Sequence, residues 1–195
     1  MTREEHLIVE LTRPVPRGQT VQTLLCGEPV DWPRALRLMG RNRLGSLVFR
    51  GLDEVDCLDA LPAAVSGQFE THYRQCVLDT RVYLEEAGRL CRALSAAGIE
   101  SLVVRGPAAG IALYGKPMLR PFSDLDVLVP RDAVDAALQA VRELGYTPRT
   151  EGFSVRYFRR HHLHVPLFLP DRRVRLELHW ALDHPYTLYT IDYPA

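Results

Sequence analysis

The stretch SLVVRGPAAGIALYGKPMLRPFSDLDVLV (residues 101–129) decides the fold. Its beginning predicts a short apolar strand over residues 99–104 that turns at Gly106 into a helix over residues 107–114. Its end predicts a second strand over residues 124–129. Glycine lets the backbone approach a ligand closely, and the free amides of a helix N-terminus attract anions. The turn is therefore a candidate phosphate-binding site.

Two carboxylates open the second strand. Side chains two residues apart in a strand point to the same face, so Asp124 and Asp126 should project together. Their mutual repulsion is costly unless a cation neutralises it, and Mg²⁺ prefers such hard oxygen ligands. Taken alone, the pair could also have no metal-binding role and simply lie at the start of a strand or cap a turn.

A third carboxylate is available further along the chain. In VRLELHW (residues 174–180) apolar and polar residues alternate, which predicts a strand with Arg175, Glu177 and His179 on one face. Glu177 could then join the two aspartates from a neighbouring strand.

The N-terminal half is expected to be helical. Residues 1–20 contain several turn-forming residues and are interpreted as an extended or partly ordered arm. Beyond it, helical spacing of apolar residues continues to Gly98, a natural C-terminal stop. Asp31 is the expected N-cap of the first helix, and a break is expected near Asn42.

The C-terminal half changes to shorter elements. A helix capped by Asp132 should end at Gly145, and further strands are expected over residues 153–158, 163–169 and 174–180. The sequence thus predicts an α/β (α+β) fold. In it, a helical region at residues 1–98 precedes an α/β core at residues 99–195, which has a mixed sheet and flanking helices.

Composition excludes several classes of protein. The 195 residues carry 24 acidic and 24 basic side chains and are 47% hydrophobic, which argues against disorder and gives no overall attraction to nucleic acid. The four cysteines form no C-x-x-C pair. The polar N-terminus is unlike a signal peptide, and no apolar run approaches the ~18 residues of a membrane span. We expect a cytoplasmic protein with no membrane partner.

Together these motifs resemble the nucleotidyltransferase fold of the polymerase-beta-like superfamily, and within it the uncharacterised bacterial nucleotidyltransferases. The resemblance covers most of residues 30–182. It rests on VRG (104–106), Tyr114, Arg120, DLDVLV (124–129), LGY (144–146), HH (161–162), ELHW (177–180) and the helical lead-in with DW (31–32).

The resemblance implies a catalytic metal site. Asp124 and Asp126 would bind two Mg²⁺ ions, with Mn²⁺ as a possible substitute, and Glu177 would join them as a metal ligand and catalytic residue. In that superfamily one ion activates the acceptor hydroxyl and the other holds the triphosphate, so that pyrophosphate leaves. Glu177 or a bound water would take the proton of the acceptor. The implied activity moves a nucleoside monophosphate from a triphosphate such as ATP to a hydroxyl-bearing acceptor.

The expected nucleotide-binding residues are Arg105, Gly106, Arg120 and Ser123. Pro107 departs from the superfamily pattern, which usually has a serine there, and the stretch that leads to the aspartates is longer than usual. Arg105 or Arg120 could replace the lost phosphate contact, because a guanidinium binds phosphate through two parallel hydrogen bonds. For Arg120, a salt bridge to the nearby carboxylates is an equal alternative.

Four histidines form a further cluster: His161, His162, His164 and His179. His162 and His164 are expected to share a strand face. We interpret His162, His164 and His179 as residues that line the acceptor pocket or orient Glu177. The alternative is a transition-metal site.

Two other functions stay open. A catalytically silent nucleotide-binding or scaffold protein would explain Pro107, and a metal hydrolase would use the histidine cluster. The acceptor could be a small molecule, a protein hydroxyl or an RNA end, and the balanced charge favours the small molecule. Relatives commonly continue into further helices beyond the point where this chain stops, at residues 193–195. We therefore expect a truncated member, a fragment, or a homodimer that completes its pocket.

Overall fold

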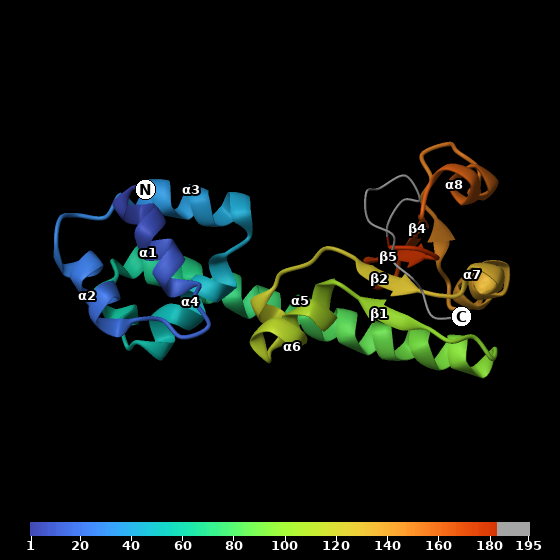
Figure 1. Ribbon diagram of the computed structural model, residues 1–195, viewed down its shortest axis with the longest axis horizontal. Coiled ribbons are helices and arrows are strands. Elements are labelled where there is room, and N and C mark those ends of the chain that lie inside the picture. The colour runs from blue at the N-terminus through green and yellow to red at the C-terminus, as the bar shows by residue number, and fades with distance from the viewer. Residues whose placement is uncertain (183–195) are drawn as a thin grey trace. The chain divides into compact units, whose positions relative to one another are not determined.

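The computed structural model describes residues 1–182 (Figure 1), so the expectation about residues 193–195 lies outside the described residues. The chain divides into two compact units. The first contains Met1–Arg81 and Ala109–Pro121, and the second contains Val82–Ala108 and the chain from Phe122 onward. The predicted α/β class with helices before a mixed sheet is confirmed. The domain boundary at residue 98 stays a prediction, because compactness does not show which segments fold alone.

The first unit is helical. Its helices are α1 (Arg3–Leu11), α2 (Gly18–Cys26), α3 (Trp32–Asn42), α4 (Gly45–Glu54), the N-terminal part of α5 (Ala63–Ala96) and α6 (Gly106–Tyr114) from Ala109 onward, with the short 3₁₀ turns η1 (Leu58–Ala60) and η2 (Pro117–Leu119). Apolar side chains from α1, α3, α4 and α5 form its core, including Leu7, Met39, Leu52 and Phe69. Asp31 caps α3 as predicted, by accepting a hydrogen bond from the Arg34 amide at 2.9 Å.

The expectation of an extended N-terminal arm is wrong, because α1 and α2 occupy most of it. Thr2 begins α1 through a reciprocal capping box: its hydroxyl accepts from the Glu5 amide, while the Glu5 carboxylate accepts from the Thr2 amide. The prolines do mark irregular backbone, but only between the two helices.

Glu10 of α1 links the start of α2 to α1. Its side chain is 1% exposed and accepts hydrogen bonds from Arg13 Nε at 3.1 Å and Arg17 Nε at 2.8 Å. The hydrogen bond from Arg17 outweighs the opposing effect of burial and lowers the pKa of Glu10 from 4.5 to about 2. The charged form therefore stabilises the folded state.

The pairing of Glu10 with Arg17 predicts that the stability difference between the wild type and Glu10→Gln depends on pH. The folded-state pKa lies below the unfolded one, so the stabilisation is complete above pH 4.5 and is lost as the pH falls toward 2. Glu10→Gln should lower the melting temperature at neutral pH, and the gap to the wild type should narrow in acid. Glu70→Gln is the control, because Glu70 pairs with Arg74 in an exposed position and should matter little at any pH. A constant gap for Glu10→Gln would contradict the assignment.

The second unit is built on a five-stranded sheet in the order β1-β2-β5-β4-β3. Its strands are β1 (Leu102–Val104), β2 (Leu125–Leu128), β3 (Thr147–Pro148), β4 (His164–Leu169) and β5 (Val174–His179). The pair β2 and β5 is parallel and the other pairs are antiparallel. Helix α6 (Gly106–Tyr114) begins directly after β1 and its turn.

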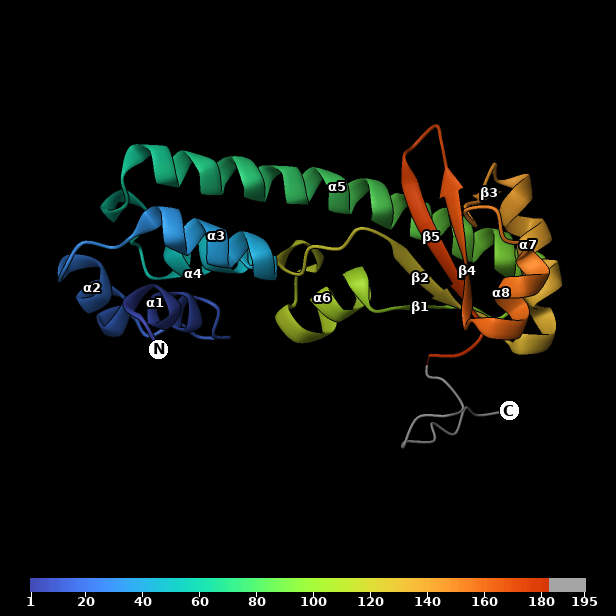
Figure 2. The same ribbon diagram turned by 90° about the horizontal axis from the view of Figure 1, so that it is seen from above.

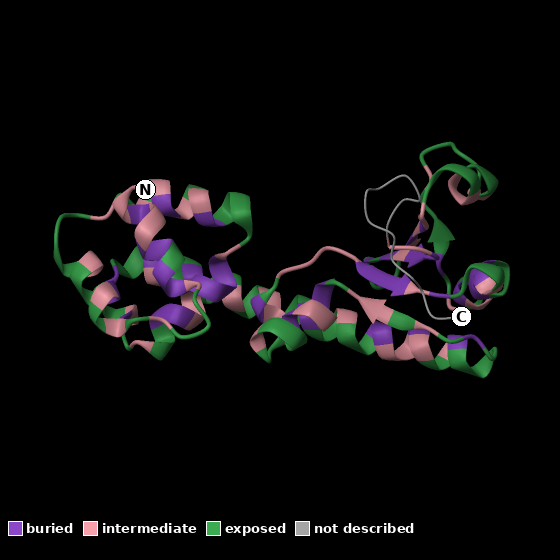
Figure 3. Ribbon diagram, viewed as in Figure 1, coloured by how far each residue is buried: buried purple, intermediate pink, exposed green. Residues whose placement is uncertain are grey.

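One face of the sheet makes the core of the second unit. Alternate residues of β2, β4 and β5 are buried there against the C-terminal half of α5 and against α7 (Val134–Glu143), and burial along β2 is visible in Figure 3. Figure 2 shows α5 and α7 running beside the sheet. The other face carries the polar alternate residues, as the pattern in VRLELHW predicted. The candidate functional residues of these strands therefore lie on the polar face of the sheet, and the opposite face forms the core.

Tyr146, from the LGY motif, fixes this packing. It is 1% exposed, and its hydroxyl donates a hydrogen bond at 3.2 Å to the fully buried carboxylate of Glu86 on α5. Arg89 completes the contact, because it binds both Glu86 and the Leu144 carbonyl oxygen. This motif residue therefore holds α5 against the end of α7 and lies in the core.

Two local predictions in this unit are wrong. The segment 153–158 is helical, as part of α8 (Val155–His161), because Ser154 caps it and basic residues in its last turn favour the helix dipole. Asp132 caps no helix: it lies in the 3₁₀ turn η3 (Arg131–Ala133), and α7 begins after it without a side-chain cap. Within residues 1–182, no helix has the length and apolar character that a bilayer span requires.

Candidate active site

The register of β2 and β5 places two carboxylates side by side. Asp126 is the direct partner of Glu177 in this parallel pair, so both side chains project from the polar face of the sheet. Asp126 is 5% exposed, whereas the Glu177 side chain is 29% exposed. The pair thus has one buried member and one that solvent reaches.

His179 lies between these carboxylates. Its Nε2 is 2.9 Å from Asp126 Oδ1 and 3.2 Å from Glu177 Oε2, and the residue is 3% exposed. Burial by itself would lower the pKa of this imidazole, but the hydrogen bonds to Asp126 and Glu177 prevail and raise it to about 9. Without a metal ion, His179 is therefore protonated at neutral pH and neutralises part of the negative charge, and a metal ion bound at Nε2 would displace this proton. Its buried Nδ1 has no partner in residues 1–182.

The turn after β1 brings a second positive charge to Asp126. Val104 pairs with Asp126 across the sheet, and Arg105 follows it directly. Arg105 Nη1 lies 3.3 Å from Asp126 Oδ1, while the side chain stays 52% exposed. Its backbone φ of 55° is in the left-handed region, which is uncommon for a residue with a Cβ. The chain also passes through positive φ at Gly106, where α6 begins.

Asp124 and Ser123 lie just before β2. The Ser123 hydroxyl donates to Asp124 Oδ2 at 3.3 Å, and both residues are half-buried. Tyr83 of α5 donates a hydrogen bond at 2.8 Å to the Ser123 carbonyl oxygen, and its ring packs edge-on against Phe122. Tyr83 thus positions the segment that carries Asp124. Local sequence patterns carry no signal for this role, because 40 residues separate Tyr83 from Ser123.

His164 extends the polar group across the next strand. It is the partner of His179 in the antiparallel pair of β4 and β5, and the two rings lie 4.8 Å apart. His164 Nε2 is 3.7 Å from Glu177 Oε1. Burial is the main reason that the pKa of His164 is lowered, although Glu177 opposes this effect. A hydrogen bond from His179 is the main reason that the pKa of Glu177 is lowered.

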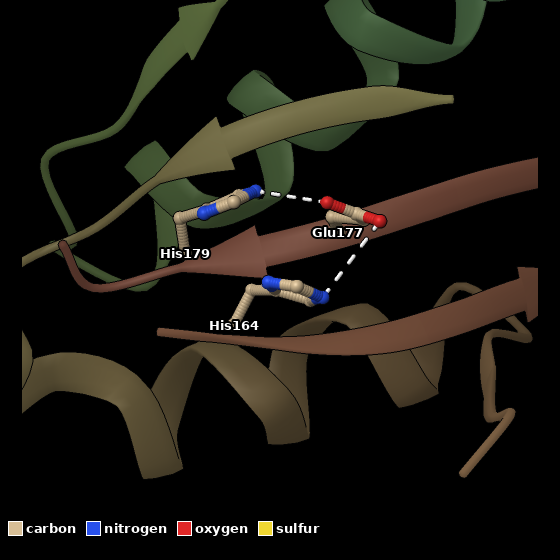
Figure 4. Close-up of side chains that lie close together, drawn as sticks. All are labelled: His164, Glu177 and His179. Carbon is tan, nitrogen blue, oxygen red and sulfur yellow. Dashed lines mark hydrogen bonds and ion pairs between the residues drawn. The ribbon is translucent and has the colours of Figure 1, made fainter. Parts of the chain in front are cut away.

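Figure 4 shows His164, Glu177 and His179 converging from β4 and β5. Each offers one ligand atom, and these three atoms lie within 4.8 Å of one another. Glu177 is the central member, with one carboxylate oxygen facing each histidine. The three side chains could hold a metal ion together.

Two predicted site residues differ from expectation, although the His162 ring still lies 6.4 Å from the ring of His164. His162 is not on a strand face with His164: it is the exposed C-cap of α8, where its ring stacks on Phe158 at 4.6 Å. Arg120 is exposed and belongs to the first compact unit. Their roles in acceptor and phosphate binding stay predictions.

The donors on the polar face fit a divalent metal ion. The carboxylates of Asp126 and Glu177 are aligned as neighbours, and their charge is already compensated by Arg105 and His179. A divalent ion bound to these carboxylates would take the place of part of this positive charge.

The second unit thus combines a mixed sheet, two neighbouring carboxylates on its polar face and an adjacent strand–turn–helix segment. The chain belongs to a nucleotidyltransferase family: the model of the family described as "Uncharacterised nucleotidyltransferase" matches residues 28–195. Comparison with curated proteins and with solved structures gives no match. Family membership supports a transferase that acts on a nucleoside triphosphate.

Proposed function

We propose that the protein is a divalent-metal-dependent nucleotidyltransferase that moves a nucleoside monophosphate from a nucleoside triphosphate to a hydroxyl-bearing acceptor. The observation that carries this proposal is the parallel register that makes Asp126 and Glu177 direct neighbours. Family membership supplies the reaction class. Mg²⁺ is the proposed ion, bound as a pair, and Mn²⁺ is its proposed substitute.

Asp124, Asp126 and Glu177 are the proposed metal ligands. When bound, the metal would stabilise charge on the phosphate oxygens and favour ionisation of the acceptor hydroxyl. Asp126 contributes a fixed carboxylate, because it is buried and held by Arg105 and His179. Asp124 lies on the segment that Tyr83 positions through Ser123.

Glu177 is better suited to ligand binding than to proton abstraction. Its lowered pKa keeps the carboxylate ionised and makes it a weak base. Its 29% exposure also gives water access to the site. We therefore assign the proton of the acceptor to water at this site, with Glu177 as an ionised ligand.

Arg105 and Gly106 are the proposed triphosphate contacts. Arg105 contacts Asp126 through one guanidinium nitrogen and is half exposed, so its other N–H groups can donate to a phosphate oxygen. The adjacent start of α6 presents backbone amides of the kind that bind anions. Ser123 and Arg120 are further proposed contacts.

We assign His164 and His179 to the acceptor side of the site and to the orientation of Glu177, which both contact. His162 is proposed as an outer contact on α8. A small-molecule acceptor, a cytoplasmic location and a homodimer belong to the same proposal.

A silent nucleotide-binding protein is the second candidate. Pro107 favours it, because this buried residue at the start of α6 provides neither a hydroxyl nor an amide proton for a phosphate. Such a protein would bind the triphosphate with metal but would not release pyrophosphate.

Two measurements separate the active transferase from the silent protein. The first is calorimetric titration with ATP, CTP, GTP and UTP, with and without Mg²⁺. The second is a pyrophosphate-release assay over a panel of hydroxyl acceptors. The proposal predicts metal-dependent binding of at least one triphosphate and acceptor-dependent release of pyrophosphate. Metal-dependent binding without release would favour the silent protein. Absence of metal-dependent binding for all four would contradict both.

A further inference from the structure

The nitrogen donors beside Glu177 are unusual partners for a Mg²⁺ site. His164 Nε2 and His179 Nε2 lie 3.7 Å and 3.2 Å from the two oxygens of the same carboxylate. Mg²⁺ prefers oxygen ligands, whereas imidazole suits Mn²⁺, Co²⁺ and Zn²⁺ better. A site with two imidazoles and one carboxylate therefore differs in metal preference from one made of Asp124, Asp126 and Glu177.

We propose that His164, Glu177 and His179 form a binding site for a divalent transition-metal ion, which shares Glu177 with the carboxylate pair. Their ligand atoms all lie within 4.8 Å of one another (Figure 4). A shift of about 1 Å or less in side-chain position would bring such atoms to the metal–ligand distances of about 2.0–2.2 Å seen for nitrogen and carboxylate oxygen.

The backbone holds this group in place. All three residues lie on regular strands, and His164 and His179 are direct partners in the β4–β5 pair. His179 is 3% exposed, which limits the orientations that its ring can adopt. Ligand atoms on paired strands are held more precisely than ligand atoms on loops. Less ordering of the side chains is therefore needed when an ion binds.

The group is also accessible to an ion. The side chains of His164 and Glu177 are 28% and 29% exposed, in contrast with His179. Access from this side leaves room for water or an acceptor hydroxyl as a further ligand, as in open catalytic metal sites. Asp126 Oδ1, at 2.9 Å from His179 Nε2, contacts this group through His179.

The inference goes beyond the proposed function, because it concerns the kind of ion and not the reaction. A transferase that uses Mg²⁺ alone would leave the imidazoles as hydrogen-bond partners. A transition-metal site would exist even if the chain released no pyrophosphate. The two claims can therefore fail separately.

The test uses chelator-treated full-length protein titrated with Co²⁺ and Mn²⁺. We expect Co²⁺ to develop visible absorption bands, and bound Mn²⁺ to show nitrogen coupling from histidine in pulsed electron paramagnetic resonance. His164→Gln should weaken Co²⁺ binding at least about tenfold, since even a lost partner of a ligand costs roughly 10- to 100-fold in affinity. His161→Gln is the matched control, because His161 is exposed on α8 and is not one of the three proposed ligands, so it should leave Co²⁺ affinity unchanged.

Several results would overturn the inference: absence of Co²⁺ binding by the wild type, bound Mn²⁺ without nitrogen coupling, or equal Co²⁺ affinity for His164→Gln and the wild type. The Mn²⁺ measurement needs no variant, so it decides the question even if His164→Gln folds poorly. Mg²⁺-dependent triphosphate binding is measured on the same preparation. If it persists while nitrogen coupling is absent, the metal inference fails and the proposed function stands.

Discussion

Asp126→Asn should reduce pyrophosphate release by at least about 1,000-fold. The substitution keeps the shape of the side chain but removes the buried charge at the centre of the site. Loss of about 4 kcal/mol of transition-state stabilisation, within the several kcal/mol attributed to metal-held charge, corresponds to roughly this factor. The measurement is the steady-state rate with saturating triphosphate and Mg²⁺.

The effect of an Asn substitution on folding stability should differ between Asp126 and Asp124. The aspartate pair by itself suggests that either Asn variant would leave melting unchanged or raise it, because repulsion is relieved. For Asp126 this expectation needs correction, because His179 and Arg105 already stabilise its charge. Asp126→Asn should lower the free energy of unfolding by about 2 kcal/mol, since hydrogen bonds to charged groups contribute roughly 1.5–3 kcal/mol. Full activity in this variant would contradict the metal assignment.

Gly51→Ala should destabilise the helical unit by about 3 kcal/mol or more. Gly51 lies in the middle of α4, and a Cβ there would overlap the Leu11 carbonyl oxygen at the end of α1. A backbone oxygen cannot move aside as a flexible side chain can, so α1 and α4 must separate. This cost is at or above the upper end of typical overpacking penalties. Urea unfolding followed by circular dichroism measures it.

Gly40→Ala is the matched control. Gly40 is also inside a helix, α3, but a Cβ there meets nothing within 4 Å. Alanine should therefore stabilise the protein by about 0.5–1 kcal/mol through its higher helix propensity. Similar effects of the two substitutions would contradict the close packing of α1 on α4.

Local patterns predicted the strands better than their pairing. Alternation in VRLELHW placed Glu177 and His179 on one face, and the Asp124–Asp126 spacing marked the start of β2. Neither pattern contains the register between β2 and β5, which depends on contacts between residues about 50 positions apart. The position of His179 between two carboxylates follows from that register.

The missed helices had readable signals. Thr2 and Glu5 have the spacing of a capping box, and Ser154 precedes a segment that ends in arginines and histidine. The left-handed backbone at Arg105 had no such signal, because glycine was the expected residue for that conformation.

The most direct test of the central claim follows the α-phosphorus of the triphosphate. The wild type and Asp126→Asn are incubated with Mg²⁺, a triphosphate radiolabelled at the α position, and a mixture of small hydroxyl metabolites, and the products are separated by chromatography. We predict that the wild type transfers the label to a new product and releases unlabelled pyrophosphate, while the variant does neither. Release of inorganic phosphate with the label left on a nucleoside diphosphate, or no difference between the two proteins, would contradict nucleotidyl transfer at this site.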